Sequence, residues 1–448
     1  MRILLVSANT CAVPYPVYPL GLDYVAGSIG EDHDVTILDM NIIGPESLGR
    51  RVKEFSPELI GLSIRNIDNT EASSPEGFIG GYRQIMETLH KNSSAPIVLG
   101  GSGFTIFPRR LMKELGAEYG VVGEGERMSL LVKTLGNGGD TDALPGIMRG
   151  EKGSGTPAPW DGPVLRRFDG SSPHVQFYLR NGGMLNLQTK RGCRFNCIYC
   201  TYPHIEGREP RLFPADEAAD TALRLEKAGA KYFFVTDAVF NGDSSHAAAV
   251  AEAFIRKRVS IPWGAYFAPT RPEPGFFELM KRAGMTHVEF GTESLSDRML
   301  GSYGKPFTLS DAAEAHKSAA GAGLHVSHFL LLGGPGESRD TVLETLSNAE
   351  NLQRTVLFFF CGVRIYPHTR LYGIALADGQ ISESDGLLEP VFYQSRQIGN
   401  DDMLRMVHER AGERKNWVFG AGGGEITRIL TRMYRRGRTG PLWEHLIQ

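Results

Sequence analysis

The sequence predicts an α/β protein in which two parallel-sheet domains are followed by a short helical C-terminal segment. Short apolar runs alternate with helix-like stretches over residues 2–122 and again over residues 184–363. Such alternation is typical of parallel sheets, because each strand needs a crossover helix to reach the next. A stretch rich in Gly, Pro, Ser and Asp separates the two series. We therefore expect a first domain at residues 1–140, a linker at 141–183, a second domain at 184–389 and a helical segment at 390–448.

The first series predicts a doubly wound parallel sheet. Its apolar runs predict strands at residues 2–7, 35–38, 59–63, 97–99 and 119–122, with helices at 19–27, 47–55, 82–90 and 109–115 between them. Ligands of such sheets bind beyond the carboxyl ends of the strands. Ser63, Gly100, Gly101 and Gly123 stand at those ends, where glycine lets the backbone approach a ligand closely. Turn geometry alone is the alternative explanation for these glycines.

The second series predicts an incomplete barrel of the TIM type. Six strands are expected at residues 184–188, 232–236, 263–267, 287–291, 325–332 and 356–363, with helices at 216–228, 245–256, 275–283, 309–322 and 338–352. Six strand–helix units without a seventh or eighth indicate a partial (β/α)6 barrel. Active sites of such barrels lie at the carboxyl ends of the strands.

Three of the five cysteines, Cys193, Cys197 and Cys200, follow the first barrel strand with the spacing C-x3-C-x2-C. Three thiolates on one loop can hold three corners of an iron–sulfur cube and leave the fourth iron open. A zinc site completed by His204 is the alternative, and buried structural cysteines are a weaker one. The loop stands at the mouth of a long strand–helix series, whereas structural zinc sites are usually small self-contained units. This position favours the cluster.

With Tyr199 directly before the last cysteine, the motif resembles that of the radical S-adenosylmethionine enzymes. From about residue 1 to about residue 415, the chain resembles the subgroup with an N-terminal cobalamin-binding-type domain. The resemblance implies a [4Fe–4S] cluster, S-adenosylmethionine on its open iron, and cobalamin on a Rossmann-like first domain. Many cobalamin domains carry Asp-x-His-x-x-Gly, but His33 is the only early histidine here and lacks that spacing. We therefore expect any cobalamin to bind without a histidine ligand from this loop.

The same resemblance implies roles for polar residues at the ends of the barrel strands. Asp237 would contact the amino group of S-adenosylmethionine, and Glu293 would hold its ribose or amino-acid end. Gly333 and Gly334 would lie beside the adenine, with the backbone of Tyr199 near that ring. For Asp237 and Glu293 the alternative role is capping of a helix that follows a strand.

The chemistry implied by the resemblance begins when the reduced cluster cleaves S-adenosylmethionine to a 5′-deoxyadenosyl radical. This radical removes hydrogen from a small-molecule or lipid-like substrate, most simply for cobalamin-dependent C-methylation. The reaction needs an external reductant such as flavodoxin or ferredoxin. One alternative is a cobalamin-independent dehydration, oxidation or cyclisation with the first domain as scaffold. A non-catalytic iron–sulfur or zinc module is another, although a pure electron carrier needs no polar barrel rim.

Composition narrows the function further. Only Cys11 and Cys361 remain outside the motif, too few for an auxiliary cluster, which argues against tRNA methylthiotransferases. A net charge of -3 gives no reason to expect nucleic acid as a partner. No apolar run has the length of a membrane span, and the cysteine pattern predicts a reduced, cytoplasmic setting. Residues 420–424 are expected to form a hinge or a linker.

Overall fold

The structure is a computed structural model that describes the chain except for residues 13–14, 154, 158, 421–422 and 448. The N-terminal domain is built on a six-stranded sheet of order β2-β1-β3-β4-β5-β6. Its strands are β1 (Arg2–Ser7), β2 (Asp34–Asp39), β3 (Leu59–Ser63), β4 (Ile97–Gly100), β5 (Tyr119–Val121) and β6 (Ile147–Arg149). All neighbours pair in parallel except β5 and β6, so the predicted parallel sheet is confirmed and carries an antiparallel edge strand.

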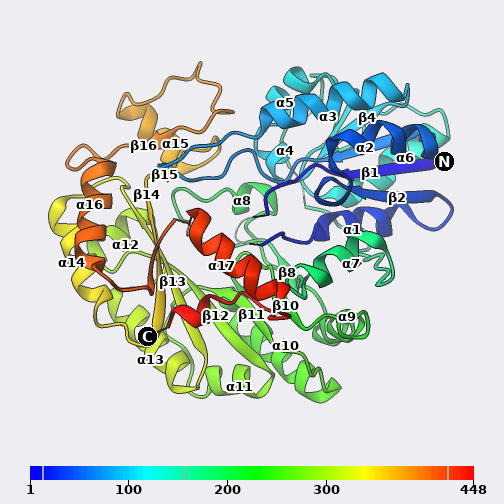
Figure 1. The fold of residues 1–448 in the computed structure, drawn as a ribbon. Helices are drawn as coiled ribbons and strands as arrows, with labels where there is room; N and C mark the ends of the chain where they lie inside the picture. Colours follow the sequence, from blue (N-terminus) through cyan, green and yellow to red (C-terminus); the bar gives the residue numbers. More distant parts are fainter. Residues whose placement is uncertain (13–14, 154, 158, 421–422, 448) are drawn as a thin grey trace.

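Helices cover both faces of this sheet, as expected for a doubly wound fold (Figure 1). They are α1 (Leu20–Ile29), α2 (Met40–Phe55), α3 (Ile79–Asn92), α4 (Ser102–Ile106), α5 (Pro108–Leu115) and α6 (Met128–Gly136). Strand order reverses between β1 and β3, which places Ser7 and Ser63 side by side at the carboxyl edge. Such a switch point opens a crevice for a ligand.

Two expectations for this half of the chain were incomplete. The expected linker contains strand β6 and helix α7 (Pro173–Arg180), whose Tyr178 donates a hydrogen bond to Asp39 over 2.7 Å. The helix expected at 47–55 begins earlier, at Met40, and bends at Gly44, where φ is 65°. The linker has too few apolar residues to show a periodic pattern. In α2, Pro45 lies inside the helix, and proline is normally a sign that a helix ends or has not yet begun.

The second domain is a partial barrel of seven parallel strands in the order β17-β14-β13-β12-β11-β10-β7. These are β7 (Met184–Leu187), β10 (Tyr232–Val235), β11 (Trp263–Phe267), β12 (Met285–Glu293), β13 (His325–Leu332), β14 (Thr355–Cys361) and β17 (Trp417–Phe419). The helices between them are α9 (Ala215–Lys227), α10 (Ser244–Lys257), α11 (Phe276–Arg282), α12 (Asp297–Tyr303), α13 (Leu309–Gly321) and α14 (Arg339–Ala349). All six expected strands are present and the partial barrel is confirmed. The seventh strand, β17, was not predicted, because it pairs with only three residues of β14 and is too short to stand out in the sequence.

The remaining elements lie around the two sheets. They are η1 (Gly125–Arg127), β8 (Lys190–Arg191), α8 (Tyr202–Ile205), β9 (Arg211–Leu212), η2 (Phe240–Gly242), β15 (Val363–Arg364), α15 (Arg370–Ala377), β16 (Phe392–Tyr393), α16 (Asn400–Ala411), α17 (Gly423–Arg435) and η3 (Trp443–Leu446). The expected hinge at 420–424 includes positions 421 and 422, which lie outside the described residues.

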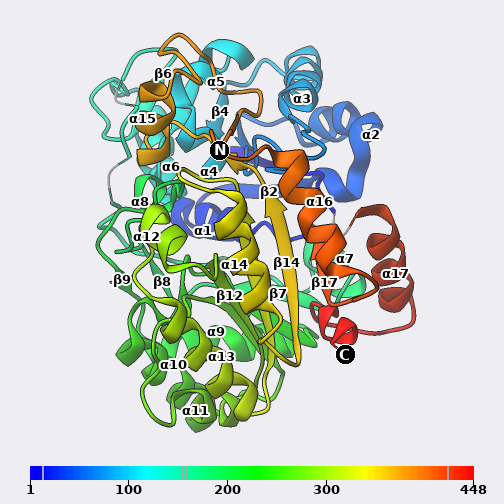
Figure 2. The same cartoon turned by 90° about the vertical axis from the view of Figure 1, so that its left-hand side faces the viewer.

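The C-terminal segment runs along the open side of the barrel, between the edge strands β17 and β7 (Figures 1 and 2). Gly440 N–H donates to Gly182 O over 3.2 Å, directly before β7. On the other side, Trp443 packs against Val356 and Val418. Helix α17 and η3 therefore bridge the gap that seven strands leave.

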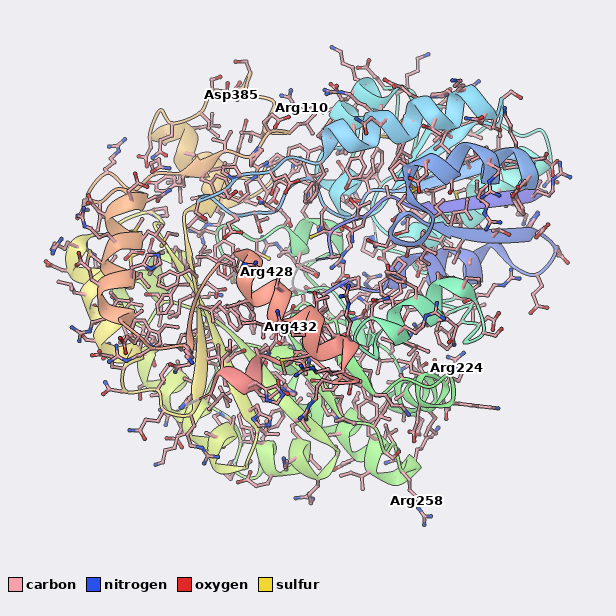
Figure 3. All side chains as sticks on the ribbon, viewed as in Figure 1. Arg110, Arg224, Arg258, Asp385, Arg428 and Arg432 are labelled. Carbon is pink, nitrogen blue, oxygen red and sulfur yellow. The ribbon has the colours of Figure 1, made fainter. Side chains whose placement is uncertain are left out.

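The two domains contact each other through buried and surface groups. Arg364 donates to Asp68 across 2.8 Å, and both side chains are almost fully buried. Arg110 of α5 bonds Asp385 O at 3.1 Å, where the segment between α15 and β16 meets the first domain (Figure 3). Among the described residues, no helix combines the length and apolar content needed to cross a bilayer.

Candidate cofactor and active site

A cavity of about 580 Å³ lies between the carboxyl edge of the first sheet and the mouth of the barrel. Ser63, Gly100, Gly101 and Gly123, the positions predicted at the strand ends, all line it. The barrel contributes the cavity-lining residues Asn186, Gln188, Arg191, Tyr202, Glu206 and Thr236. The two predicted ligand edges thus open into one space.

Glycine is found at this edge of the sheet for two different structural reasons. Gly101 has a φ of 100°, and a Cβ there would lie 2.5 Å from Ile64 O, so the turn itself requires glycine. Gly100 is different, because a Cβ there would meet nothing closer than Val121 at 3.9 Å. Its missing side chain leaves room beside the cavity, as a corrin close to the backbone would need.

No histidine is among the described residues that line this cavity. His33 instead lies at the far end of the sheet, with Nδ1 at 3.2 Å from the amino terminus. The cavity wall combines the hydroxyls of Ser7, Ser63 and Ser102 with apolar side chains such as Leu99 and Val121. A large ring with polar amide arms, such as cobalamin, fits a wall of this mixed character.

The cysteine loop stands at the barrel mouth, after the short strand β8. Cys193 N–H donates to Gly207 O at 3.1 Å, and Ile198 N–H donates to Tyr303 O at 3.0 Å. Gly192 begins the loop with a φ of 86°, where a Cβ would lie 2.4 Å from Glu209 O. The loop backbone is therefore held at both ends before any metal binds.

Burial raises the pKa of all three motif thiols, that of Cys200 to about 12. The positive charge of Lys305 partly offsets this for Cys197 and Cys200. These thiols therefore remain protonated until a metal replaces the proton, which is how iron–thiolate and zinc–thiolate sites form.

The zinc site completed by His204 is contradicted by the structure. The His204 ring stacks on His368 with centroids 4.0 Å apart, and its Nε2 lies 3.3 Å from Thr105 O. Across the described part of the chain, no three His, Cys, Asp or Glu side chains converge to hold a single metal ion. A tetrahedral zinc ion needs such convergence, whereas the thiolates of a cluster each bind a different iron. The donor set fits the cluster.

Glu293 lies beside the cysteine loop and caps no helix. Its carboxylate accepts hydrogen bonds from the Tyr199 hydroxyl and from Lys305 Nζ, the latter over 2.7 Å. Burial alone would lower the pKa of Lys305, but Glu293 and Cys197 outweigh it and hold that pKa above its usual value. Glu293 also has a φ of 61° at a register shift between β12 and β13. Such strained, bulged positions cluster at functional sites, where they re-aim a side chain.

The glycine turn after β13 contacts Tyr303, which in turn packs against Tyr199 beside Glu293. Gly334 N–H donates to the Tyr303 hydroxyl over 3.2 Å, and the Tyr303 ring packs edge-on against Tyr199 with centroids 6.0 Å apart. A Cβ on Gly334 would lie 2.1 Å from the Tyr303 ring, so close packing explains this glycine. Gly333 N–H donates to the buried Glu337 over 3.1 Å. The structure thus brings Tyr199, Glu293 and Gly334 together.

Asp237 stands apart from this group. Its carboxylate accepts from Thr189 N–H at 2.7 Å, Thr189 Oγ1 at 2.5 Å and Lys190 Nζ at 3.0 Å. It caps no helix, since Asp243 does so for α10. With every bond directed at the turn before the cysteine loop, Asp237 fixes the position of that loop, and its contact with the cofactor stays a prediction.

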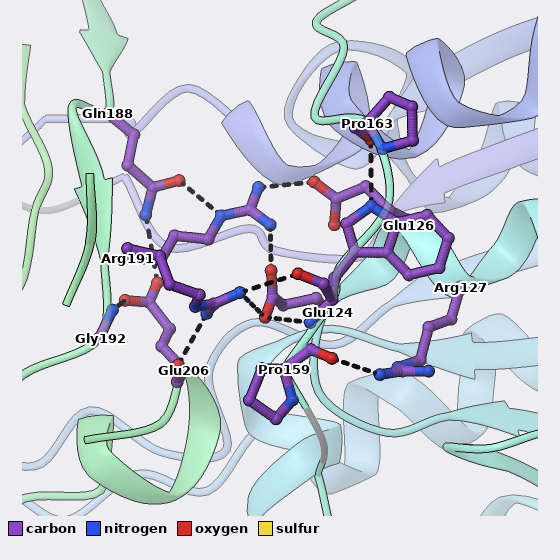
Figure 4. A network of polar contacts seen from close by, with 11 residues as sticks. Glu124, Glu126, Arg127, Pro159, Pro163, Gln188, Arg191, Gly192 and Glu206 are labelled. Atoms are coloured by element: carbon purple, nitrogen blue, oxygen red, sulfur yellow. Dashed lines mark hydrogen bonds and ion pairs between the residues drawn. The ribbon is translucent and has the colours of Figure 1, made fainter. Parts of the chain in front are cut away.

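Sequence reasoning missed the network that holds the cluster loop against the first domain (Figure 4). Arg191 bonds Glu124 at 2.5 Å and Glu126 at 2.6 Å, and all three side chains are buried. Gln188 and Glu206 extend the network to Gly192 N–H, at the start of the loop. Lys305 was missed too. Neither cation belongs to a motif, so only the fold reveals their partners.

Comparisons with known proteins agree with this geometry. Residues 187–349 match the family model of the Radical SAM superfamily, and residues 6–132 match that of the B12 binding domain. An uncharacterized methyltransferase of Pyrococcus horikoshii is 27% identical over 396 residues, which cover 84% of each chain. A tryptophan 2-C-methyltransferase of Streptomyces laurentii is 23% identical over 471 residues, covering 89% of this chain and 78% of the relative.

The fold is also similar to that of a solved structure. The radical S-adenosylmethionine methyltransferase TsrM from Kitasatospora setae, with a tryptophan substrate and a SAM analog bound, aligns with a TM-score of 0.87. The alignment covers 99% of this chain and 97% of the other at 22% identity.

The partial barrel with its three-cysteine loop is that of a radical S-adenosylmethionine enzyme. A B12-binding domain precedes this barrel in the chain. The chain therefore belongs to the cobalamin-binding radical S-adenosylmethionine enzymes. Their cofactors are a [4Fe–4S] cluster, S-adenosylmethionine and cobalamin. The expected family, fold class and cofactors are confirmed.

Proposed function

We propose that this enzyme transfers a methyl group from S-adenosylmethionine through cobalamin to a carbon atom of a small molecule. The observation that carries the proposal is the shared cavity, lined by Gly100 and Ser63 from the B12-binding sheet and by Gln188 and Thr236 from the barrel. Methyl transfer and hydrogen removal act on one carbon, so both cofactor sites must open to one space. The similar proteins described above carry methyltransferase names.

When bound, the cluster supplies the electron that splits S-adenosylmethionine, and cobalamin carries the methyl group. The residues of the chain position these groups. Cys193, Cys197 and Cys200 would hold three irons and leave the fourth for S-adenosylmethionine. Glu293, fixed by Lys305 and Tyr199, would bind the ribose or amino-acid end of that cofactor. The electron comes from an external reductant such as flavodoxin or ferredoxin.

Binding of corrin by the first domain is the test of this function. Hydroxocobalamin is titrated into anaerobically reconstituted protein, and corrin absorption is followed through gel filtration. Gly100→Phe should fill the cavity edge and abolish co-elution, because the open space beside Gly100 is lost. Gly80→Phe is the matched control, since Gly80 lies exposed on α3 of the same domain with open space around it.

Stoichiometric corrin in the parent and the control, but not in Gly100→Phe, supports the proposal. If corrin fails to co-elute while the cluster and S-adenosylmethionine cleavage stay intact, methylation is wrong. The cobalamin-independent radical reaction is then the better account.

A further inference from the structure

Tyr266 is 42% exposed although it lies in β11, a strand near the middle of the barrel sheet. Its neighbours Ala265 and Phe267 point to the opposite face and are buried in the core beneath the helices. Side chains alternate between the two faces of a strand, so Tyr266 points into the barrel. Part of the Tyr266 ring is therefore accessible from inside the barrel, where Tyr15 of the N-terminal segment comes within electrostatic reach of Tyr266 and Glu289.

Other rings lie beside Tyr266 inside the barrel. Tyr266 contacts Phe234 of β10 with ring centroids 4.8 Å apart and Phe329 of β13 at 6.4 Å. Phe329 stacks on Phe358 at 4.9 Å and on Phe360 at 6.4 Å. We call these five side chains the ring-lined lumen. Rings from four strands, β10, β11, β13 and β14, thus line one side of the barrel interior.

Glu289 of β12 pairs in register with Tyr266 and brings an acid to this wall. It is 3% exposed, and its Oε1 accepts from Trp443 Nε1 over 2.9 Å. Its Oε2 has no hydrogen-bond partner among the residues that the structure describes. Burial raises the pKa of Glu289 to about 7. A buried carboxyl with one oxygen free is costly unless a ligand completes its hydrogen bonding.

Two groups of residues border the lumen. His287 lies 3.1 Å from the Tyr232 hydroxyl and packs edge-on against Trp443 at 5.0 Å. Asn186 pairs in register with Phe234 and lines the cavity shared with the B12-binding sheet. Tyr202 lines that cavity too and lies within electrostatic reach of Tyr266. A ligand in the lumen would therefore face the cofactor cavity.

We propose that the ring-lined lumen is the substrate pocket and that it takes a flat aromatic molecule whose N–H group donates to Glu289. The proposal rests on the proposed function, whose substrate class it names. Aromatic rings stabilise one another in stacked or edge-to-face contact, which Tyr266 and Phe329 offer. A nitrogen-bound hydrogen pointed at Glu289 Oε2 would fill the missing bond. Molecules of the same shape without the N–H group leave that acid unpaired, and such sites reject them strongly.

The test compares indole with benzofuran, which has the same shape but carries an oxygen atom where indole has its N–H group. Binding to the holoenzyme is measured by anaerobic titration calorimetry at about pH 8.5, where Glu289, with its pKa raised to about 7, is ionised and accepts only. Indole should bind at least about tenfold more tightly than benzofuran, the difference expected for one charge-assisted hydrogen bond. Glu289→Gln should erase this preference while Trp443 keeps its acceptor. Tyr266→Ala should weaken both probes, whereas Phe267→Leu, on the opposite face of the same strand, should change neither.

Equal affinities for the two probes, no binding of either, or a preference that survives in Glu289→Gln would overturn the proposal. The measurement does not depend on methyl transfer. A protein that prefers indole but retains no corrin would contradict the proposed function and leave the aromatic pocket standing.

Discussion

Arg191 Nη2 lies 2.6 Å from Glu126 Oε1, and this buried ion pair joins the cluster loop to the B12-binding domain. Arg191 stands two residues before Cys193, and Glu126 follows the carboxyl end of β5. The carboxylates of Glu126 and Glu124 hold the pKa of Arg191 above its usual value despite its burial. The ion pairs of Arg191 with Glu124 and Glu126 therefore hold the cluster loop next to the edge of the cofactor cavity.

Arg191→Met should destabilise the protein by about 3–5 kcal/mol, because Glu126 would stay buried without its cation. Glu124 keeps a partner in Arg211 at 2.6 Å. The free energy of unfolding, from urea denaturation monitored by circular dichroism, measures the loss.

The second change Glu126→Gln should recover part of this loss, because it removes the stranded charge. Arg83→Met breaks the exposed pair with Glu114 and should cost at most about 1 kcal/mol. Equal losses for Arg83→Met and Arg191→Met would contradict the role of the buried network.

The sequence predicts two parts of this site: the cysteine motif, which lies in one short stretch, and the glycines, which stand at the ends of predicted strands. The cluster loop is recognisable because Cys193, Cys197 and Cys200 occur within eight residues. Gly100 and Gly123 were identifiable because the ends of parallel strands meet at one edge. In both cases local sequence and strand alternation suffice.

Residues whose partners lie far away along the chain could not be predicted in this way. Glu126 and Arg191 are 65 residues apart, and Glu289 and Trp443 are 154 apart. Lys305 follows an ordinary helix, and nothing in its neighbours indicates that it meets Glu293. Such pairs depend on how two domains and the C-terminal segment pack, which periodicity does not report.

Each of Cys193→Ala, Cys197→Ala and Cys200→Ala should abolish the brown colour and the paramagnetic signal of the reduced cluster. The parent protein, reconstituted without oxygen, should bind about four irons per chain. Cys361→Ala is the control, because Cys361 packs against an apolar cluster and should leave the iron content unchanged. Iron analysis and electron paramagnetic resonance check these outcomes, and stoichiometric zinc without iron would refute the assignment.

Glu293→Gln should keep the cluster but weaken binding of S-adenosylmethionine about tenfold or more. The reason is the loss of a charged acceptor, worth roughly 1.5–3 kcal/mol in such hydrogen bonds. Calorimetry on the reconstituted protein gives the affinity, and Glu314→Gln on an exposed face of α13 is the control. Unchanged affinity would assign Glu293 to holding Lys305 and Tyr199 only.

Glu289 should make stability fall as pH rises. Burial raises its pKa from the ordinary 4.5 to about 7, so the folded protein keeps a proton that the unfolded chain has lost. The contribution of protonated Glu289 to the free energy of unfolding is complete below about pH 4.5. It decreases by about 1.4 kcal/mol per pH unit between about pH 4.5 and about pH 7. Tyr15, Tyr232 and Tyr266 face the carboxyl but stay protonated in this range, because burial raises the pKa of each.

Glu289→Gln removes this titration. The difference in unfolding free energy between the parent and Glu289→Gln should therefore change by roughly 3 kcal/mol between pH 4.5 and pH 7. Denaturant titrations at several pH values measure it. A difference that does not vary with pH would show that Glu289 is ionised throughout.

Transfer of a labelled methyl group is the most direct test of the central claim. The anaerobic holoenzyme is mixed with a chemical reductant such as titanium(III) citrate, which brings the corrin to the cobalt(I) form that accepts a methyl cation, and with S-adenosylmethionine that carries an isotopic label in its methyl group. The corrin is then extracted and its mass is measured by mass spectrometry. The account predicts labelled methyl on the corrin of the parent protein, and none on corrin that is mixed with Gly100→Phe and the same reagents, because that variant should not bind it. Consumption of S-adenosylmethionine by a corrin-loaded enzyme that leaves the corrin unlabelled would contradict it.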